Sequence, residues 1–278
     1  MRLLKQLVPA AAVAFVGGRA VGAVAGNVLL TLVVGVATAV LAVVTYAWTV
    51  RWSERRAPVE VAAAGAPAAV GRGVLIGVGM CAIVIVNIAF LGGYRVEGFG
   101  SVTGPVGLFG FMAAAAVTEE VVYRGILFRI VEERTGTWMA LALTAVLFGL
   151  SHLLNPHADL WGAIAIALEA GGMFAAAYAA TRSLWLPIGL HFGWNFTVAG
   201  VFGAEVSGNG TPQGLLNAVT SGPTLLSGGE FGPEASLYTV VSGVVLTIVF
   251  SWLAHRRGRI VPLRRRIARS GAVATLPR

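Results

Sequence analysis

Six polar residues stand inside apolar stretches of this sequence, at spacings that bring some of them together on helices. They are Glu119, Glu120, Arg124, His152, His191 and Asn195. Residues four apart on a helix are neighbours, and the second glutamate and the arginine have that spacing, as do the second histidine and the asparagine. A charge at the centre of a bilayer costs at least about 2.5–3.5 kcal/mol on insertion scales, so a functional role is the default hypothesis.

The two glutamates have different neighbours on their helix. Glu120 is four residues before Arg124, so this pair can neutralise itself inside a membrane. Glu119 is rotated by about 100° from Glu120 and stacks over Tyr123, so it lacks the in-helix cation. A carboxylate that is free to face a cavity suits a general base. The alternative interpretation is that both glutamates only brace the helix bundle through Arg124.

The two histidines and the asparagine allow two kinds of chemistry. Together with a glutamate they could activate a water molecule and hold an oxyanion. They could also bind a metal, because two histidines and a carboxylate with an open position form a catalytic zinc pattern, with Glu119, His152 and His191 as ligands. The expected cofactor is therefore either none or one divalent metal, zinc being the candidate. Each histidine alone could also be a core imidazole bonded to a backbone carbonyl.

The metal-free scheme is the simpler of the two. A metal bound by Glu119 would leave no free carboxylate as base, because Glu120 is committed to Arg124. Asn195 is a poor zinc ligand compared with histidine or carboxylate, but its amide can donate a hydrogen bond to an oxyanion. We therefore favour a hydrolase that depends weakly or not at all on metal.

The elements that carry these residues are long and apolar. Hydrophobic residues make up 57% of the 278 residues and charged residues 12%, about half the share in a soluble domain. Most apolar segments are long enough to cross a bilayer as a helix, and they lack the alternation of barrel strands. This predicts an all-α, polytopic transmembrane helical bundle of about eight spans, in one membrane domain, 1–278. The predicted segments are 7–25, 27–50, 73–93, 105–128, 138–154, 161–181, 184–203 and 236–254.

The distribution of basic residues predicts the orientation. With the N-terminus inside, 17 of the 20 Lys and Arg residues lie on the inner side, and the loop 204–235 has none. This asymmetry follows the positive-inside rule, so a multi-pass cell-membrane protein with both termini cytoplasmic is expected. The basic tail 255–278 is expected to attract anionic lipid headgroups. That distribution also argues against nucleic acid as a partner.

Four further features lead to smaller expectations. Residues 7–25 could be a span, a cleaved signal peptide or an interfacial helix. The loop 204–235 is rich in Gly, Ser, Pro and Thr and is expected to be exposed and flexible. Glu169 either lines the same cavity or makes a structural pair. Close helix contacts are expected at three GxxxG pairs, Gly22/Gly26, Gly73/Gly77 and Gly189/Gly193.

The topology leaves a discrepancy in depth. At about 1.5 Å per residue, Glu119 and His191 lie about 10–14 Å from the inner face, whereas His152 lies at about 20 Å. A short or tilted fifth span, or segment ends misplaced by a turn, would remove the difference.

Three motifs in order resemble one known family. The motifs are EEVVYRG at 119–125, FGLSH at 148–152 and HFGWN at 191–195. They are similar to the patterns EExxxR, FxxxH and HxxxN or HxxxD of the CPBP family, the CAAX proteases and bacteriocin-processing enzymes. The resemblance covers residues 105–203, which are the expected catalytic core.

The resemblance implies an intramembrane endopeptidase, described for some relatives as a metalloprotease and in other accounts as glutamate-dependent. It implies that Glu119 and His152 activate water, that His191 and Asn195 stabilise the oxyanion, and that Glu120 and Arg124 complete the first motif. The expected substrate is a membrane-associated protein or peptide. The Ala/Gly/Val/Arg-rich composition is typical of a high-GC bacterium, where relatives are linked to peptide maturation and bacteriocin self-immunity.

Two other classes of function remain open from the sequence. Intramembrane Glu, His and Arg also build the proton relays of ion-coupled transporters, although no inverted repeat is visible. A non-catalytic membrane scaffold or immunity protein that keeps the site as a relic is the other alternative.

Overall fold

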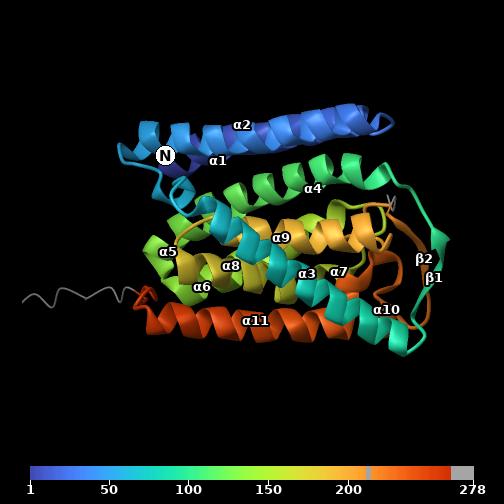
Figure 1. Cartoon of the computed structure of the whole chain (residues 1–278). Helices are drawn as coiled ribbons and strands as arrows, with labels where there is room; N and C mark the ends of the chain where they lie inside the picture. Colours follow the sequence, from blue (N-terminus) through green and yellow to red (C-terminus); the bar gives the residue numbers. More distant parts are fainter. Residues whose placement is uncertain (211–213, 264–278) are drawn as a thin grey trace, which may run out of the picture.

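The computed structural model describes residues 1–210 and 214–263, which form a bundle of long helices (Figure 1). Within these residues, seven helices are long and apolar enough to cross a membrane. The all-α, polytopic prediction is therefore confirmed. The segment predicted at 184–203 also forms a helix, but it is shorter than these seven and mostly buried.

The chain order of the long elements follows the predicted segments closely. Three of the helices contain a wider π-helical stretch, at Val121–Phe128, Ala167–Gly171 and Thr197–Val201. The α-helices are α1 (Arg2–Ala23), α2 (Val28–Glu54), α3 (Ala66–Phe90), α4 (Gly104–Glu120), α5 (Arg129–Thr135), α6 (Thr137–Ser151), α7 (Leu160–Ile166), α8 (Gly172–Thr181), α9 (Trp185–Phe196), α10 (Thr224–Ser227) and α11 (Leu237–Arg256).

Polar side chains mark where several helices begin. Asn27 caps α2 by accepting a hydrogen bond from the Leu30 amide at 3.0 Å. Asp159 and Ser236 cap α7 and α11 in the same way. Such caps satisfy amide groups that have no partner within the helix, and they are worth about 1 kcal/mol each.

The crossing of α3 and α9 depends on glycine. A Cβ atom on Gly77 would lie 2.4 Å from the Leu190 carbonyl oxygen, and one on Gly189 would lie 2.3 Å from the Val70 carbonyl oxygen. The two backbones therefore meet at a distance that only glycine permits, as two of the three predicted GxxxG pairs require. The third prediction is wrong, because a Cβ on Gly22 or Gly26 would meet open space.

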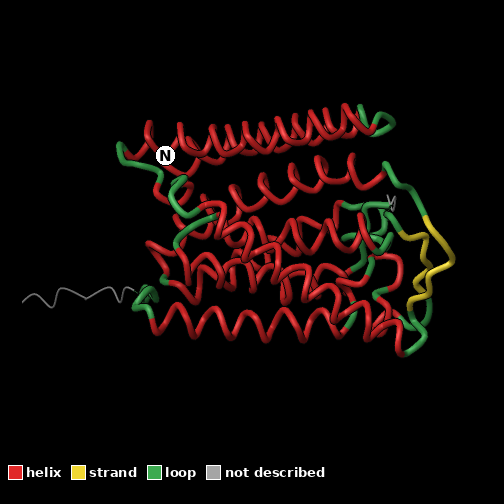
Figure 2. The backbone as a smooth tube through the Cα atoms, in the orientation of Figure 1, coloured by secondary structure: helices red, strands yellow, loops and turns green. Residues whose placement is uncertain are grey.

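The loop 204–235 differs from its prediction. Its residues Leu216–Thr220 form strand β2, which pairs antiparallel with strand β1 (Tyr94–Phe99) at one end of the bundle (Figure 2). Phe231 and Glu234 of this loop are 2% exposed. The polar, glycine-rich composition indicated a mobile loop, but the described part folds back onto the helices. We call this end of the bundle the strand end.

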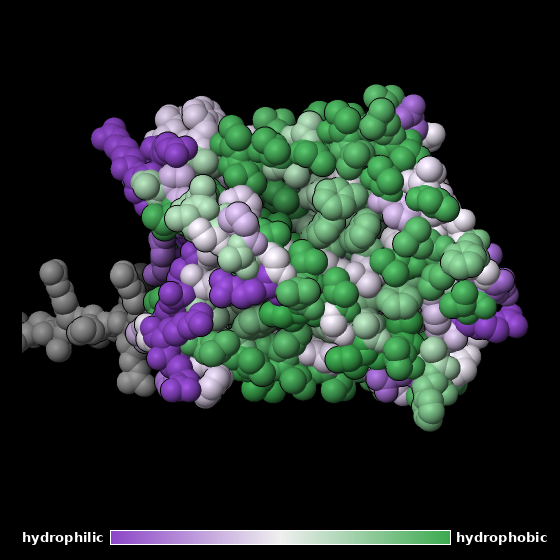
Figure 3. Space-filling view, in the orientation of Figure 1, coloured by the Kyte–Doolittle hydropathy of each residue, from purple (hydrophilic) through white to green (hydrophobic). Residues whose placement is uncertain are grey.

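The opposite end, the basic end, holds the N-terminus, the α2–α3 linker, the α5–α6 and α8–α9 turns and the start of the C-terminal tail (Figure 1). Hydrophilic side chains gather there, whereas apolar side chains cover most of the middle of the molecule on the visible face (Figure 3). This matches the predicted inner side, without testing its orientation. The tail arginines Arg264, Arg265, Arg266, Arg269 and Arg278 lie outside the described residues.

Buried polar contacts join α1 to the bundle at the basic end. Arg129 bonds to Glu54 at 2.8 Å and to the side-chain oxygen of Gln6 at 2.7 Å. Gln6 in turn donates to Glu54 at 2.7 Å. Since Gln6 is fully buried, α1 packs in the structure as an integral helix of the bundle.

Candidate active site

The predicted polar residues converge where α4, α6 and α9 meet. Each of the three π-helical stretches lies beside this point, one directly after Glu120, one around Glu169 and one two residues after Asn195. π-Helical turns are rare and occur frequently at functional sites, because the wider turn frees a carbonyl group and redirects side chains.

Glu120 links the first and third motifs. Its Oε1 atom accepts a hydrogen bond from Arg124 at 2.8 Å, as the four-residue spacing predicts, and lies 3.1 Å from Nδ1 of His191. All three side chains are almost fully buried. The sequence placed Glu120 only with Arg124, so its contact with the histidine is an addition from the structure. Glu120 thereby fixes the orientation of the His191 ring.

Arg124 has partners on several sides, although its Nε atom has no hydrogen-bond partner among the described residues. Its guanidinium donates to the Ala170 and Gly171 carbonyls, both at 3.2 Å, at the end of a π-helical stretch. Its carbon Cζ lies 4.4 Å from the centre of the Phe148 ring and 5.1 Å from that of Phe174. A buried guanidinium is tolerated only with such partners, because the desolvation cost of an unpaired ion is several kcal/mol.

Glu119 faces a cavity of about 180 Å³, and so do His152, His191 and Asn195. The Glu119 side chain is 33% exposed, and its Oε2 atom lies 3.9 Å from Nε2 of His191, which is beyond hydrogen-bond distance. This oxygen has no hydrogen-bond partner among the described residues. Of the two glutamates, Glu119 is therefore the one whose carboxylate is not bound to Arg124.

The hydrogen bonds decide which ring nitrogens are available. Nδ1 of His152 lies 2.8 Å from the Phe148 carbonyl oxygen, which can only accept, so Nδ1 carries the proton. In a neutral His152, Nε2 then carries a lone pair and can accept a proton. Nδ1 of His191 donates to Glu120 by the same argument, so His191 donates through Nε2 only when both nitrogens are protonated.

His191 is also fixed by stacking. The rings of Phe174 and His191 are 4.7 Å apart and within 19° of parallel. Asn195 lies one turn further along α9, on the same face, and is 8% exposed. The predicted shared face of His191 and Asn195 is therefore present, and both side chains reach the cavity.

A misplaced helix end accounts for the part of the discrepancy in depth that concerns Glu119. The segment predicted to end at residue 128 continues through its π-helical stretch to Thr135. Seven more residues add about 10 Å of helix at 1.5 Å each, which moves Glu119 away from the basic end to the level of His152. The cavity is bordered by Asn155, Ser207 and Asn209 of the strand-end loops.

The predicted metal ligands do not form a ligand cluster. Within residues 1–210 and 214–263, no three His, Cys, Asp or Glu side chains are grouped as a metal ion requires. Glu119, His152 and His191 share a cavity, but as they are arranged they do not provide three converging ligand atoms.

The sequence left the role of Glu169 undecided and did not single out Glu234. Glu169 does not line the main cavity; it is 2% exposed and borders a smaller void beneath it, together with Glu234. Glu234 accepts hydrogen bonds from Trp194 Nε1 at 3.2 Å, from the Ser207 hydroxyl at 3.1 Å and from the Ser207 amide. It thereby fastens the loop 204–235 to α9. Its place in a glycine-rich loop gave no indication of this role.

Glu234 makes stability depend on pH. Burial raises the pKa of its carboxyl from 4.5 to about 7, although the hydrogen bonds from Ser207 and Trp194 oppose the shift. Between these values the folded state binds the proton and the unfolded state does not, so the free energy of unfolding falls as pH rises from about 4.5 to about 7. The expected loss is at most about 3 kcal/mol.

Thermal unfolding of the purified protein at several pH values measures this effect. Glu234→Gln should be less stable at low pH, because one acceptor is lost, and its stability should fall less than that of the wild type between pH 4.5 and 7. Glu230→Gln changes an exposed glutamate of the same loop and should keep the wild-type slope. An unchanged slope in Glu234→Gln would contradict the assignment.

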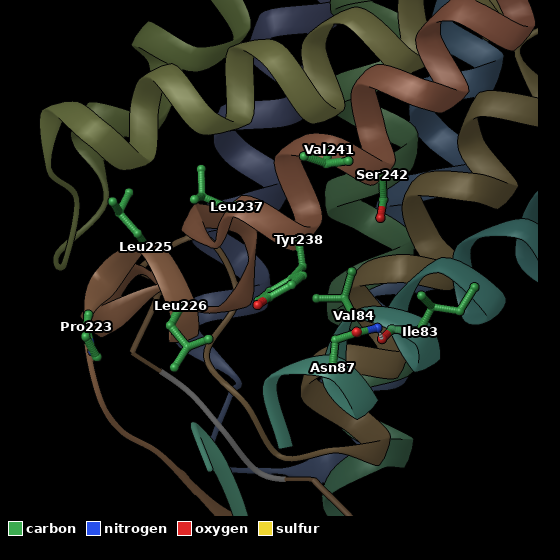
Figure 4. Close-up of a pocket in the computed structure, with 10 residues that line it drawn as sticks. All are labelled: Ile83, Val84, Asn87, Pro223, Leu225, Leu226, Leu237, Tyr238, Val241 and Ser242. Carbon is green, nitrogen blue, oxygen red and sulfur yellow. Dashed lines mark hydrogen bonds between the residues drawn. The ribbon is translucent and has the colours of Figure 1, made fainter. Parts of the chain in front are cut away.

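Larger cavities elsewhere offer no comparable chemistry. Figure 4 shows one of about 490 Å³ between α3, α10 and α11, with Leu226, Leu237 and Val241 among its apolar walls. The polar groups on its lining are Asn87, Tyr238 and Ser242, without a histidine or a carboxylate. The smaller polar cavity at Glu119 is therefore the candidate active site.

Fold and site together define a class, a polytopic helical membrane protein whose bundle holds a cavity lined by carboxylate, imidazole and amide groups. Residues 101–197 match the family described as "Type II CAAX prenyl endopeptidase Rce1-like". This stretch contains all three motifs, so the resemblance to the CPBP family is confirmed over these residues.

A curated relative agrees with the family match. A stretch of 79 residues is 33% identical to a protein of Bacillus subtilis (strain 168) named "Putative membrane peptidase YdiL". The match covers 28% of this chain and 30% of that protein's length. No solved structure matches the chain.

Proposed function

We propose that this protein is a membrane endopeptidase that hydrolyses a peptide bond of a membrane-associated protein or peptide. The observation that carries the proposal is the meeting of Glu119, His152, His191 and Asn195 at one polar cavity, where one carboxylate oxygen of Glu119 has no hydrogen-bond partner among the described residues. The family match and the relative named as a membrane peptidase support the reaction class. Bacterial peptide maturation and bacteriocin self-immunity are the roles that fit this class.

In the proposed reaction, Glu119 is the general base. A water between Glu119 and Nε2 of His152 loses a proton to the carboxylate, and its oxygen bonds to the scissile carbonyl carbon. The C–N bond then breaks, and the protonated Glu119 returns the proton to the departing amine. Proton transfer of this kind contributes about 10²–10⁴-fold to the rate.

His191 and Asn195 stabilise the negative oxygen that forms in this step. In this scheme both ring nitrogens of His191 carry a proton, so Nε2 donates to the oxyanion while Nδ1 keeps its proton and donates to Glu120. Asn195 donates through its amide. Donors fixed in advance at a site with little water stabilise charge more strongly than solvent does, and removal of one such donor costs about 10²–10³-fold in kcat. Glu120 and Arg124 act through His191, as positioning residues.

The proposed access side follows from the cavity and the charges. If the basic end is cytoplasmic, as the positive-inside rule favours, the cavity is reached from the half of the membrane that faces away from the cytoplasm. The polar loop residues Asn155, Ser207 and Asn209 would then meet the substrate first.

The proposal is tested with purified protein in proteoliposomes and a set of quenched fluorescent peptides, with the cleaved bond located by mass spectrometry. We expect cleavage that persists after treatment with a strong chelator. Metal content is measured in parallel. Stoichiometric zinc, with activity lost on chelation and restored by zinc, would replace the metal-free scheme. Absence of cleavage across lipid-anchored and unanchored peptides would contradict the endopeptidase proposal.

A further inference from the structure

A second cavity, of about 550 Å³, lies at the basic end of the bundle, away from Glu119. It is bordered by α3, by the turn between α8 and α9, and by the last turns of α11 with the residues after it. Three arginines line it, Arg72, Arg257 and Arg259. We call it the arginine pocket. No histidine or carboxylate lines it.

The three arginines lack acidic partners. Several buried or half-buried arginines at this end are paired, as Arg129 is with Glu54 at 2.8 Å and Arg182 with Glu132. Within the described part of the chain, by contrast, no Asp or Glu lies within ion-pair distance of Arg72, Arg257 or Arg259. The pocket therefore collects three positive charges that the protein does not balance, and this favours an anionic ligand.

The backbone fixes two of these arginines. The Ala180 carbonyl, at the C-terminal end of α8, accepts hydrogen bonds from Arg257 at 2.9 Å and from Arg259 at 2.6 Å. Burial and the positive charges of Arg257 and Arg182 lower the pKa of Arg259 from its usual value. An arginine with five donors has several left after one such bond, so both side chains can still bind a ligand.

One wall of the pocket is apolar, whereas Thr181 and Ser183 add hydroxyl groups on the side of the α8–α9 turn. Ile76, Leu186, Phe250 and Leu253 line it on the side toward the middle of the bundle. Trp185 also lines it and donates through Nε1 to the Ala62 carbonyl at 2.8 Å. A tryptophan with one hydrogen-bonded edge beside an apolar wall is typical of the boundary between headgroups and acyl chains.

We propose that the arginine pocket binds one anionic phospholipid, with its phosphate on Arg72, Arg257 and Arg259 and an acyl chain along the wall at Ile76, Phe250 and Leu253. Basic pockets between transmembrane helices suit such headgroups. The chain's own residues 264–278 are a poor occupant, because they contain five arginines and no Asp or Glu. The expectation of headgroup binding at the tail thereby becomes a specific site on described residues, independent of the proposed peptidase activity.

Native mass spectrometry of the detergent-purified protein tests this site, titrated in turn with phosphatidylglycerol, phosphatidylcholine and inorganic phosphate. We expect one phosphatidylglycerol to bind with at least tenfold preference over phosphatidylcholine. Arg72→Gln should weaken this binding about fivefold, and Arg72→Gln/Arg257→Gln/Arg259→Gln about 100-fold, at about 1 kcal/mol per arginine. Among the described residues, Arg72 bonds only to the Ala68 carbonyl of its own helix, so the single variant should fold normally.

The matched control is Arg51→Gln/Arg55→Gln/Arg134→Gln. This triple variant removes three exposed arginines from the same end of the bundle but outside the pocket. Its affinity for phosphatidylglycerol should match that of the wild type. Equal weakening in the control and pocket variants would show diffuse attraction to basic residues and overturn the proposal. Equal affinity for inorganic phosphate and phosphatidylglycerol would also overturn it, because the apolar wall would then contribute nothing.

Discussion

Replacement of Glu119 by glutamine is expected to reduce peptide cleavage at least 100-fold while the protein stays folded. Glutamine has nearly the same shape, so packing around the cavity is kept. It cannot take a proton from water, and general-base catalysis is worth about 10²–10⁴-fold. Because the Glu119 side chain is 33% exposed and does not bond to Arg124, its loss should cost little stability. Cleavage rate and thermal unfolding, measured on the same preparation, separate the two effects.

The matched control for this variant is Glu97→Gln. Glu97 is a partly exposed glutamate of β1 that pairs with Arg95 at 2.9 Å, at the strand end. The Glu97→Gln variant loses the same charge as Glu119→Gln, but outside the cavity. Its cleavage rate should match that of the wild type. Full activity in Glu119→Gln would contradict the role of Glu119 as base. Loss of activity in both variants would point to a general effect of charge at the strand end.

The fold was largely readable because the helices follow from hydropathy. Long apolar runs must satisfy their backbone groups internally, which in lipid leaves helices or closed barrels. The position where a helix ends was harder to predict than the presence of the helix. Residues 129–135 include Arg129, Glu132, Glu133 and Arg134, which indicate an exposed turn. The helix nevertheless continues through α5, because Arg129 pairs with Glu54 at the end of α2 and Glu132 pairs with Arg182 in the turn after α8.

The site was readable as a set of residues but not as a network of contacts. Spacings of four predicted the bond between Glu120 and Arg124, because both residues lie on one helix. The contact between Glu120 and His191 joins residues 71 positions apart, so no local spacing indicates it. Glu234 was missed for the same reason, since its donors Trp194 and Ser207 are distant in sequence. The proposed catalytic roles rest on the family resemblance and await the variants.

The largest effect on stability is expected for Arg124→Met. This change leaves the Glu120 carboxylate, 0% exposed, without its cation, and its Oε2 atom already has no partner among the described residues. Breaking a buried ion pair from one side costs about 3–5 kcal/mol, because an uncompensated charge stays buried. Chemical unfolding in detergent should show this loss. Arg134→Met, an exposed arginine near the end of α5, should remain near wild-type stability.

A double-mutant cycle distinguishes the charge from the packing. Glu120→Gln alone should also be costly, because it leaves the Arg124 guanidinium buried without a counter-ion. The double variant Glu120→Gln/Arg124→Met has no buried charge at this pair, so its loss of stability should be smaller than the sum of the two single losses, by about 1–3 kcal/mol. It should nevertheless stay inactive, since the carboxylate that accepts the hydrogen bond from Nδ1 of His191 is gone and the ring loses its fixed orientation. Additive losses of stability would mean that Arg124 acts through its contacts with Phe148, Phe174 and the π-helical carbonyls. Cleavage by the double variant would contradict the role of Glu120 in positioning His191.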